Sequence, residues 1–164
     1  MNGLARIIAT LVIVSALSGC GAGTLSNAEF VAQANAACTA DNALAQPLLS
    51  SPQVTPSPGG ESAELLNSIT KVIPIVQDLQ RKLAALNPPA AKQAEYIHGL
   101  SLLVQLVSKL SEIRDALAAN GLQNTVQLQD RGNELNSLGE LLDSTAANLG
   151  LTECANIAHT QVYG

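Results

Sequence analysis

Few residues in this 164-residue sequence have types and spacings that could support chemistry. Glu95 and His98 form an E-x-x-H pair, half of the set that holds a di-iron centre in a helical bundle. The sequence has no second pair of this kind, so we expect His98 to be an ordinary helix residue. Zinc bound by Cys38, Cys154 and His159 would require reduced thiols. With no G-x-S-x-G, P-loop or G-x-G-x-x-G motif either, an enzyme is the least supported class, and we expect no metal or cofactor.

The first nineteen residues have the pattern of an export signal. Arg6 is followed by an apolar run from Ile7 to Leu17, which is shorter than the roughly 20 apolar residues of a transmembrane helix and fits a secretory signal. The next residues, ending in Ser18-Gly19-Cys20, resemble the lipobox of bacterial lipoproteins. That resemblance implies that residues 1–19 are removed and that Cys20 carries a diacylglyceryl group, commonly with an added amide-linked acyl chain of the palmitate type. The alternative is an ordinary signal peptide whose Cys20 joins the disulfides.

The lipobox assignment determines what is expected of the other two cysteines. The protein would lie on the outer face of the bacterial cytoplasmic membrane, where paired thiols oxidise. With Cys20 assigned to lipid, we predict that Cys38 and Cys154 form a disulfide. Residues 20–25 would then be a lipidated tether too short to hold the domain far from the bilayer.

The composition excludes several kinds of partner. Eight basic residues against 13 acidic ones give a net charge of -5, and the basic residues form no cluster. The chain is therefore not expected to bind nucleic acid, and attachment to the membrane would depend on the acyl chains alone. With two tyrosines, one phenylalanine and no tryptophan, stacking of sugars or bases is not expected.

The remaining chain reads as helices separated by proline and glycine. Ser26 and Glu29 form a capping box that predicts a helix start, and Pro47 predicts its end. We predict further helices over residues 62–86, 90–119 and 124–149, the last two ending at Asn120-Gly121-Leu122 and at Gly150-Leu151 in Schellman motifs. Asn124 and Gln127 repeat the capping pattern at the start of the last helix. A tail, residues 156–164, contains His159 and Tyr163.

The helix over residues 62–86 carries the clearest periodicity. Its apolar residues recur in alternating steps of four and three, the seam of helical bundles, at Leu65, Ile69, Val72, Val76, Leu79, Leu83 and Leu86. Pro74 lies inside this seam, so a kink is expected there, either opening a gap between helices or producing a harmless bend. The proline-rich segment 50–60 is either a plain surface loop or a site of O-glycosylation.

Beyond the lipobox, residues 26–155 resemble a group of small proteins. Phe30 and Cys38 lie in a helix with alanines between them, Pro88-Pro89 marks a helical hairpin, and Leu149-Gly150-Leu151-Thr152-Glu153-Cys154 closes the domain. These features are similar to the small alanine-rich secreted and lipoprotein domains of actinobacteria, including mycobacteria. That family is largely uncharacterised, and the resemblance supplies no catalytic residues.

We therefore predict an all-α, up-down four-helix bundle over residues 26–155, stapled by one disulfide and anchored by lipid. The expected function is binding of a protein partner in the cell envelope, through the helix over residues 90–119 or the 50–60 segment. The alternative is a carrier for a lipid or another apolar ligand, with Pro74 opening a groove between the second and third helices. We expect this groove, or alternatively the protein interface, to be formed by Val72, Val76, Leu103 and Val107.

Overall fold

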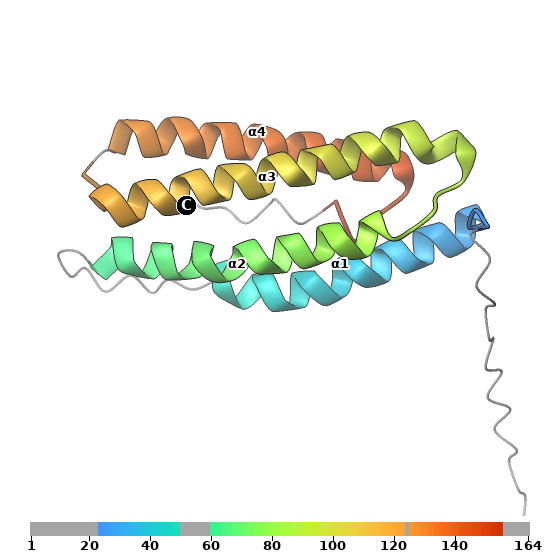
Figure 1. The fold of residues 1–164 in the computed structure, drawn as a ribbon, viewed down its shortest axis with the longest axis horizontal. Coiled ribbons are helices and arrows are strands. Elements are labelled where there is room, and N and C mark those ends of the chain that lie inside the picture. The colour runs from blue at the N-terminus through green and yellow to red at the C-terminus, as the bar shows by residue number, and fades with distance from the viewer. Residues whose placement is uncertain (1–22, 50–59, 124, 156–164) are drawn as a thin grey trace, which may run out of the picture.

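The computed structural model describes residues 23–49, 60–123 and 125–155, and within them it is an up-down four-helix bundle without strands (Figure 1). Successive helices run in opposite directions along the long axis. This confirms the predicted fold class. The helices are α1 (Asn27–Leu49), α2 (Gly60–Ala84), α3 (Gln93–Asn120) and α4 (Thr125–Leu149), with a short 3-10 helix, η1 (Ala90–Lys92), before α3.

The first helix begins at the predicted capping box and ends slightly later than predicted. The Ser26 N–H donates to Glu29 Oε2 at 3.0 Å, and the Glu29 N–H donates to Ser26 Oγ at 3.3 Å. The Ser26 hydroxyl also donates to Glu29 Oε2, at 2.6 Å, and this bond, together with the one from the Ser26 N–H, lowers the pKa of the Glu29 carboxyl. Pro47 does not end the helix, which continues to Leu49. Leu48 and Leu49 are partly buried against the core, and this packing favours the two extra helical residues.

The predicted seam of α2 forms the centre of the core. Ile69, Val72, Val76, Leu79 and Leu83 are buried, while Leu65 and Leu86 pack against them at the two ends. Pro74 lies inside α2 on its exposed side. Val72, Ile73 and Val76 are buried on either side of it, so α2 stays packed against the bundle through this region.

The turn between α2 and α3 forms at Asn87-Pro88-Pro89, as predicted. Pro88 is buried, and the Lys92 N–H donates to the Pro89 carbonyl at 2.8 Å in the turn that leads into α3. The carbonyl of Asn87 accepts a hydrogen bond of 2.9 Å from the N–H of Leu25. The chain that precedes α1 is therefore fixed to this turn.

The ends of α3 and α4 both use glycine but differ in structure. Gly150 has a φ of 79°, its N–H donates to Ala147, and the Leu151 N–H donates to Ala146, which together form the predicted Schellman motif. The end of α3 is different, because Gly121 makes the single bond to Leu117 and the Schellman bond from Leu122 is not formed. Leu151 is accordingly buried at 3% exposure, whereas Leu122 is 37% exposed.

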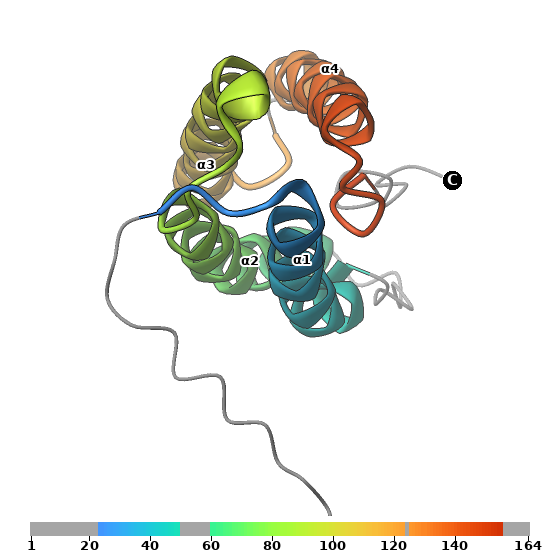
Figure 2. The ribbon, with the colours of Figure 1, turned by 90° about the vertical axis from the view of Figure 1, so that its right-hand side faces the viewer.

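The four helices pack in sequence order, α1 on α2, α2 on α3 and α3 on α4. Direct backbone contact between α1 and α4 is sparse, and Figure 2 shows the segment after α4 reaching across to α1 on this side of the bundle. At the end of the bundle where α1 begins, Phe30 packs edge-to-face on Tyr96, with ring centroids 5.0 Å apart. None of the helices in the described part of the chain is both long and apolar enough to cross a membrane.

Candidate functional site

The most distinctive structure in the molecule is the closing segment, Gly150–Ala155, which joins the end of α4 to α1. Cys154 in this segment forms a disulfide with Cys38 of α1, with an S–S distance of 2.01 Å. This confirms the predicted pairing. Both cysteines are buried, and Leu151 in the same segment belongs to the core.

Two asparagines of α1 hold the closing segment on either side of the disulfide. Asn35 Oδ1 accepts a hydrogen bond of 3.1 Å from the backbone N–H of Glu153. Asn42 Nδ2 donates to the carbonyl of Glu153 at 2.9 Å. Asn35, Cys38 and Asn42 follow one another at steps of three and four, so they share one face of α1. That face binds the closing segment through one covalent bond and two hydrogen bonds.

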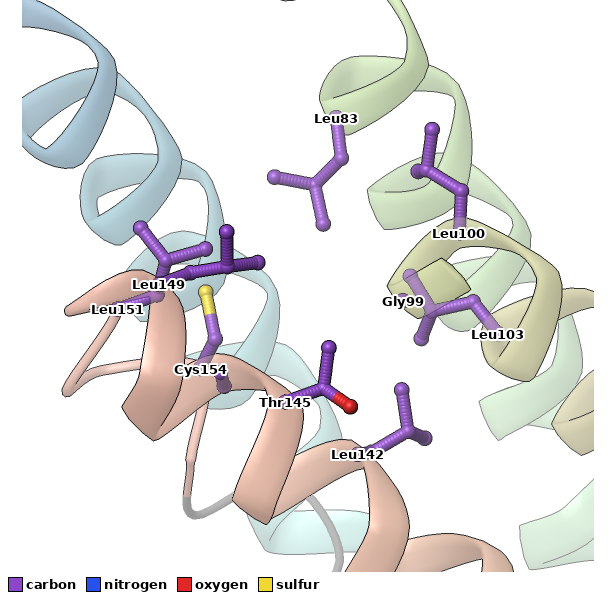
Figure 3. Close-up of a pocket in the computed structure, with 10 residues that line it drawn as sticks. Leu83, Gly99, Leu100, Leu103, Leu142, Thr145, Leu149, Leu151 and Cys154 are labelled. Carbon is purple, nitrogen blue, oxygen red and sulfur yellow. The ribbon is translucent and has the colours of Figure 1, made fainter. Parts of the chain in front are cut away.

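A small apolar cavity of about 40 Å³ lies behind the closing segment (Figure 3). Side chains from α2, α3, α4 and the closing segment face one another across it. Its volume is well below the roughly 150 Å³ of an apolar cavity that binds benzene. A chain-like ligand would therefore have to enlarge it. The lining residues are Leu83, Gly99, Leu100, Leu103, Leu142, Thr145, Ala146, Leu149, Leu151 and Cys154.

Gly99 allows α3 and α4 to approach closely at this cavity. A Cβ atom added to Gly99 would lie 3.2 Å from Thr145 Cγ2, closer than an ordinary van der Waals contact. Neither Gly99 nor Thr145 is among the residues predicted for the site. The available signal was a glycine inside an otherwise strong helical pattern, which often marks a close helix contact.

The four residues predicted for a groove or interface do not line this cavity together. Leu103 lines it, whereas Val72 and Val76 are buried in the α2 seam. Val107 is partly buried and packs against the core. The predicted groove was beside Pro74. The observed cavity is instead near the end of α4, because Leu83 and the closing segment form part of its wall.

The surface of α3 carries an apolar strip formed by Ile97, Leu100, Val104 and Val107. Ile97 is 58% exposed and Val104 is 50% exposed, while Leu100 and Val107 are partly buried against the core. Their steps of three, four and three residues place them along one side of the helix. Single exposed apolar residues are normal on protein surfaces, and what makes these residues a candidate binding surface is their alignment along one side of α3.

A second unexpected feature is a buried carboxylate between α1 and α2. The side chain of Asp41 is 3% exposed, and its Oδ1 lies 2.8 Å from Lys82 Nζ. Asp41 Oδ2 is buried and has no hydrogen-bond partner within the described structure. Lys82 also contacts Asp78 at 2.8 Å. The hydrogen bond with Asp41 is the main reason that the pKa of Lys82 is raised.

We expect Lys82→Met to destabilise the fold much more than Arg81→Met. Loss of Lys82 leaves the buried Asp41 carboxylate without a cation, whereas Arg81 contacts the partly exposed Asp78. Thermal unfolding followed by circular dichroism should show the larger fall in Tm for Lys82→Met. Adding Asp41→Asn to this variant should recover part of the loss. Equal falls in Tm for the two single variants would show that the contact of Lys82 with Asp41 contributes no more to stability than the contact of Arg81 with Asp78.

An ion pair between α3 and α4 gives a pH-dependent prediction. Lys109 Nζ lies 2.8 Å from Glu134 Oε2, and its hydrogen bond lowers the pKa of Glu134 from 4.5. Because the folded pKa is the lower one, this contribution is present above pH 4.5 and is lost as pH falls through the folded pKa. We expect Glu134→Gln to lower Tm slightly at neutral pH and to match the wild type in acid. A difference that persists or grows in acid would contradict this.

The described residues form no metal centre. Among them, no three histidine, cysteine, aspartate or glutamate side chains lie close enough to hold a metal ion. His98 is exposed, and Glu95 accepts a hydrogen bond from Asn148 at 3.3 Å. Cys20, the segment 50–59, Asn124, and the tail with His159 and Tyr163 lie outside the described residues. The predictions of a lipid anchor and of a non-enzymatic role therefore remain predictions.

Comparison with known proteins gives no relative from which a function could be transferred. No family model, curated protein or solved structure matches the chain.

Proposed function

We propose that this chain is a lipid-anchored binding protein on the outer face of a bacterial cytoplasmic membrane, without catalytic activity. The binding role rests on the α3 strip, in which the two most exposed side chains, Ile97 and Val104, are at least half exposed. An apolar strip on a rigid helix suits a protein partner in the cell envelope. The partner would cover the strip and thereby remove apolar surface from water.

The support for the anchor comes from the division of the cysteines. The sequence contains three, and Cys38 is paired with Cys154. This bridge leaves Cys20 as the cysteine available for acylation, directly after the apolar run at residues 7–17. A diacylglyceryl group with a further acyl chain provides the two hydrophobic signals that stable membrane attachment requires.

The anchor is tested by Cys20→Ser in the full chain. We expect this variant to be released from the membrane or to remain unprocessed, while non-reducing mass mapping still finds Cys38 joined to Cys154. The wild type should carry a mass increase on its N-terminal peptide equal to the acyl groups. Scrambled disulfides in the variant, or an unmodified Cys20 in the wild type, would contradict the division of the cysteines.

The binding role is tested by placing a photo-crosslinking amino acid at Val104 in the full chain, expressed in its own membrane. Gln105 is the matched control, because it is also exposed but lies about 100° further round α3. We expect Val104 to crosslink to one protein and Gln105 to give no such product. Crosslinking at neither position, or equally at both, would contradict an interface on the α3 strip.

The cavity supports a second candidate, a carrier for a lipid or another apolar ligand. Its lining is almost wholly apolar, and it lies beneath a segment that covers one side of the bundle. Native mass spectrometry of protein purified from its own membrane separates the two candidates. A co-purifying lipid, in addition to the covalent anchor, would favour the carrier, and an empty monomer would weaken it.

A further inference from the structure

The start of the described chain is fixed to one end of the bundle. The Leu25 N–H donates to the Asn87 carbonyl at 2.9 Å, and the Leu25 side chain packs against the core. The Ser26 and Glu29 capping box then sets the first turn of α1 directly beyond it. In Figure 1 and Figure 2 the start of α1 lies beside the turn between α2 and α3. Any anchor on Cys20 therefore pulls on this end of the molecule.

The length of chain between anchor and domain limits how far this end can lie from the bilayer. Five residues lead from Cys20 to Leu25, and fully extended they span about 18 Å. The 28 residues of α3 run about 42 Å along the bundle. The end that carries Gly121 would therefore reach the bilayer only if the bundle lay on its side.

The distribution of charge favours an upright orientation over a bundle lying on its side. The eight residues from Ala84 to Ala91 include no charged side chain. Lys92 follows them, and its ammonium group donates a hydrogen bond to the carbonyl of Leu149. Two carboxylates in the first turns of α1 and α3, Glu29 and Glu95, accept hydrogen bonds from Ser26 and Asn148.

The long sides of the bundle, in contrast, carry exposed or partly exposed charges, several of them acidic. Examples are Glu112, Asp115 and Glu134, whereas the charges in the last turn of α2, next to the turn, are the basic Arg81 and Lys82. Because anionic headgroups repel carboxylates, contact through a long side costs more than contact through the turn, whose own residues are uncharged.

We propose that the turn between α2 and α3, residues 87–91, is the membrane-facing surface of this protein and rests on the lipid headgroups. This inference depends on the proposed acylation of Cys20. In this orientation α3 rises away from the bilayer, and its apolar strip begins about 10 Å above the turn at Ile97 and ends near 25 Å at Val107. The strip would then be presented to a partner that is itself embedded in or attached to the membrane.

The orientation is tested with full-length protein purified from its membrane and reconstituted in vesicles of phosphatidylcholine and phosphatidylglycerol. A fluorescent label is attached to a cysteine introduced at Ala91, at Ser101 or at Gln123, all of which are exposed. Quenching by lipids with a nitroxide on the headgroup reports proximity to the surface. We expect quenching at Ala91→Cys to exceed that at Gln123→Cys several-fold, with Ser101→Cys between them.

The controls separate a wrong orientation from a missing anchor. Intact mass must show acylation of Cys20 and retention of the native disulfide in each labelled variant, with Ala90→Cys as a second position in the turn. Cys20→Ser combined with Ala91→Cys should lose the quenching. Equal quenching at all three positions, or none at Ala91 in acylated protein, would overturn the orientation while leaving the anchor intact. An unmodified Cys20 would overturn both proposals, and the mass alone would reveal it.

Discussion

Removal of the disulfide by Cys38→Ala together with Cys154→Ala should lower the free energy of unfolding by about 2–5 kcal/mol. The bridge spans 116 residues, and the chain-entropy model gives about 4.7 kcal/mol for a loop of roughly this length. This loss would be a large part of the free energy of unfolding of a typical domain, which is about 5–15 kcal/mol. Alanine is the appropriate replacement because both positions are buried, where a serine hydroxyl would need a new hydrogen bond.

The loss of stability should be accompanied by a local change in α1. This helix packs on α2, and it reaches α4 through the closing segment, which the disulfide and the hydrogen bonds of Asn35 and Asn42 hold in place. We expect amide hydrogen exchange in residues 27–49 to accelerate more than in α3, which lies between two helices.

Urea unfolding and hydrogen exchange test these two statements separately. Reduced wild-type protein serves as the control, and its urea midpoint should fall toward that of the double variant. An unchanged midpoint would show that the bridge contributes little to stability. A lower midpoint with equal acceleration in all four helices would show that the bridge acts on the whole fold and that α1 does not detach on its own.

The helices could be predicted from the sequence because their signals are local. The Ser26 and Glu29 box, the spacing of the α2 seam and Gly150-Leu151 each depend on residues within two turns of one another. Pro47 was misleading because its effect competes with packing of Leu48 and Leu49, which depends on distant helices. Gly121 was misleading for a similar reason, since the hydrophobic contact that often accompanies a Schellman motif depends on packing, and Leu122 is exposed where Leu151 is buried.

The candidate site was less predictable because its parts come together only in the folded bundle. The disulfide was predictable once Cys20 was assigned, but the cavity depends on how closely Gly99 brings α3 toward Thr145. In the sequence Asp41 has the pattern of an exposed helix residue. Its pairing with Lys82, 41 positions away, exists only in the folded structure. Asn35 and Asn42 could have been suspected, because polar residues one turn on either side of a buried cysteine can bind the segment that the bridge brings in.

Replacement of Phe30 by alanine should be among the most damaging single changes in the chain. Phe30 is fully buried, and its ring meets that of Tyr96 at an interplanar angle of 84°. Removal of a buried phenylalanine side chain typically costs about 3–5 kcal/mol, because the cavity that remains is only partly filled. The Tyr96 hydroxyl is fixed by donation to the Leu83 carbonyl at 2.5 Å, so its ring has little freedom to move into the space.

Urea unfolding of the purified variants measures this cost. Phe30→Leu should be milder, because leucine keeps much of the volume and loses chiefly the edge-to-face contact, worth about 0.5–1.5 kcal/mol. Leu44→Ala is the control on the same helix, since Leu44 is 60% exposed, and it should change stability by no more than about 0.5 kcal/mol. A loss for Phe30→Ala no larger than that of Leu44→Ala would show that this end of the bundle is not tightly packed.

The same variant also separates folding from anchoring. Phe30 lies ten residues after Cys20 and within the domain, whereas the apolar run and the proposed lipobox precede it. Export and acylation should therefore proceed in Phe30→Ala, and the mass of its N-terminal peptide should equal that of the wild type. The destabilised bundle would then be attached to the membrane but easily degraded, with a lower steady-state amount. If Phe30→Ala instead lacked the acyl groups, processing at Cys20 would depend on the folded domain, contrary to the division of the chain proposed above.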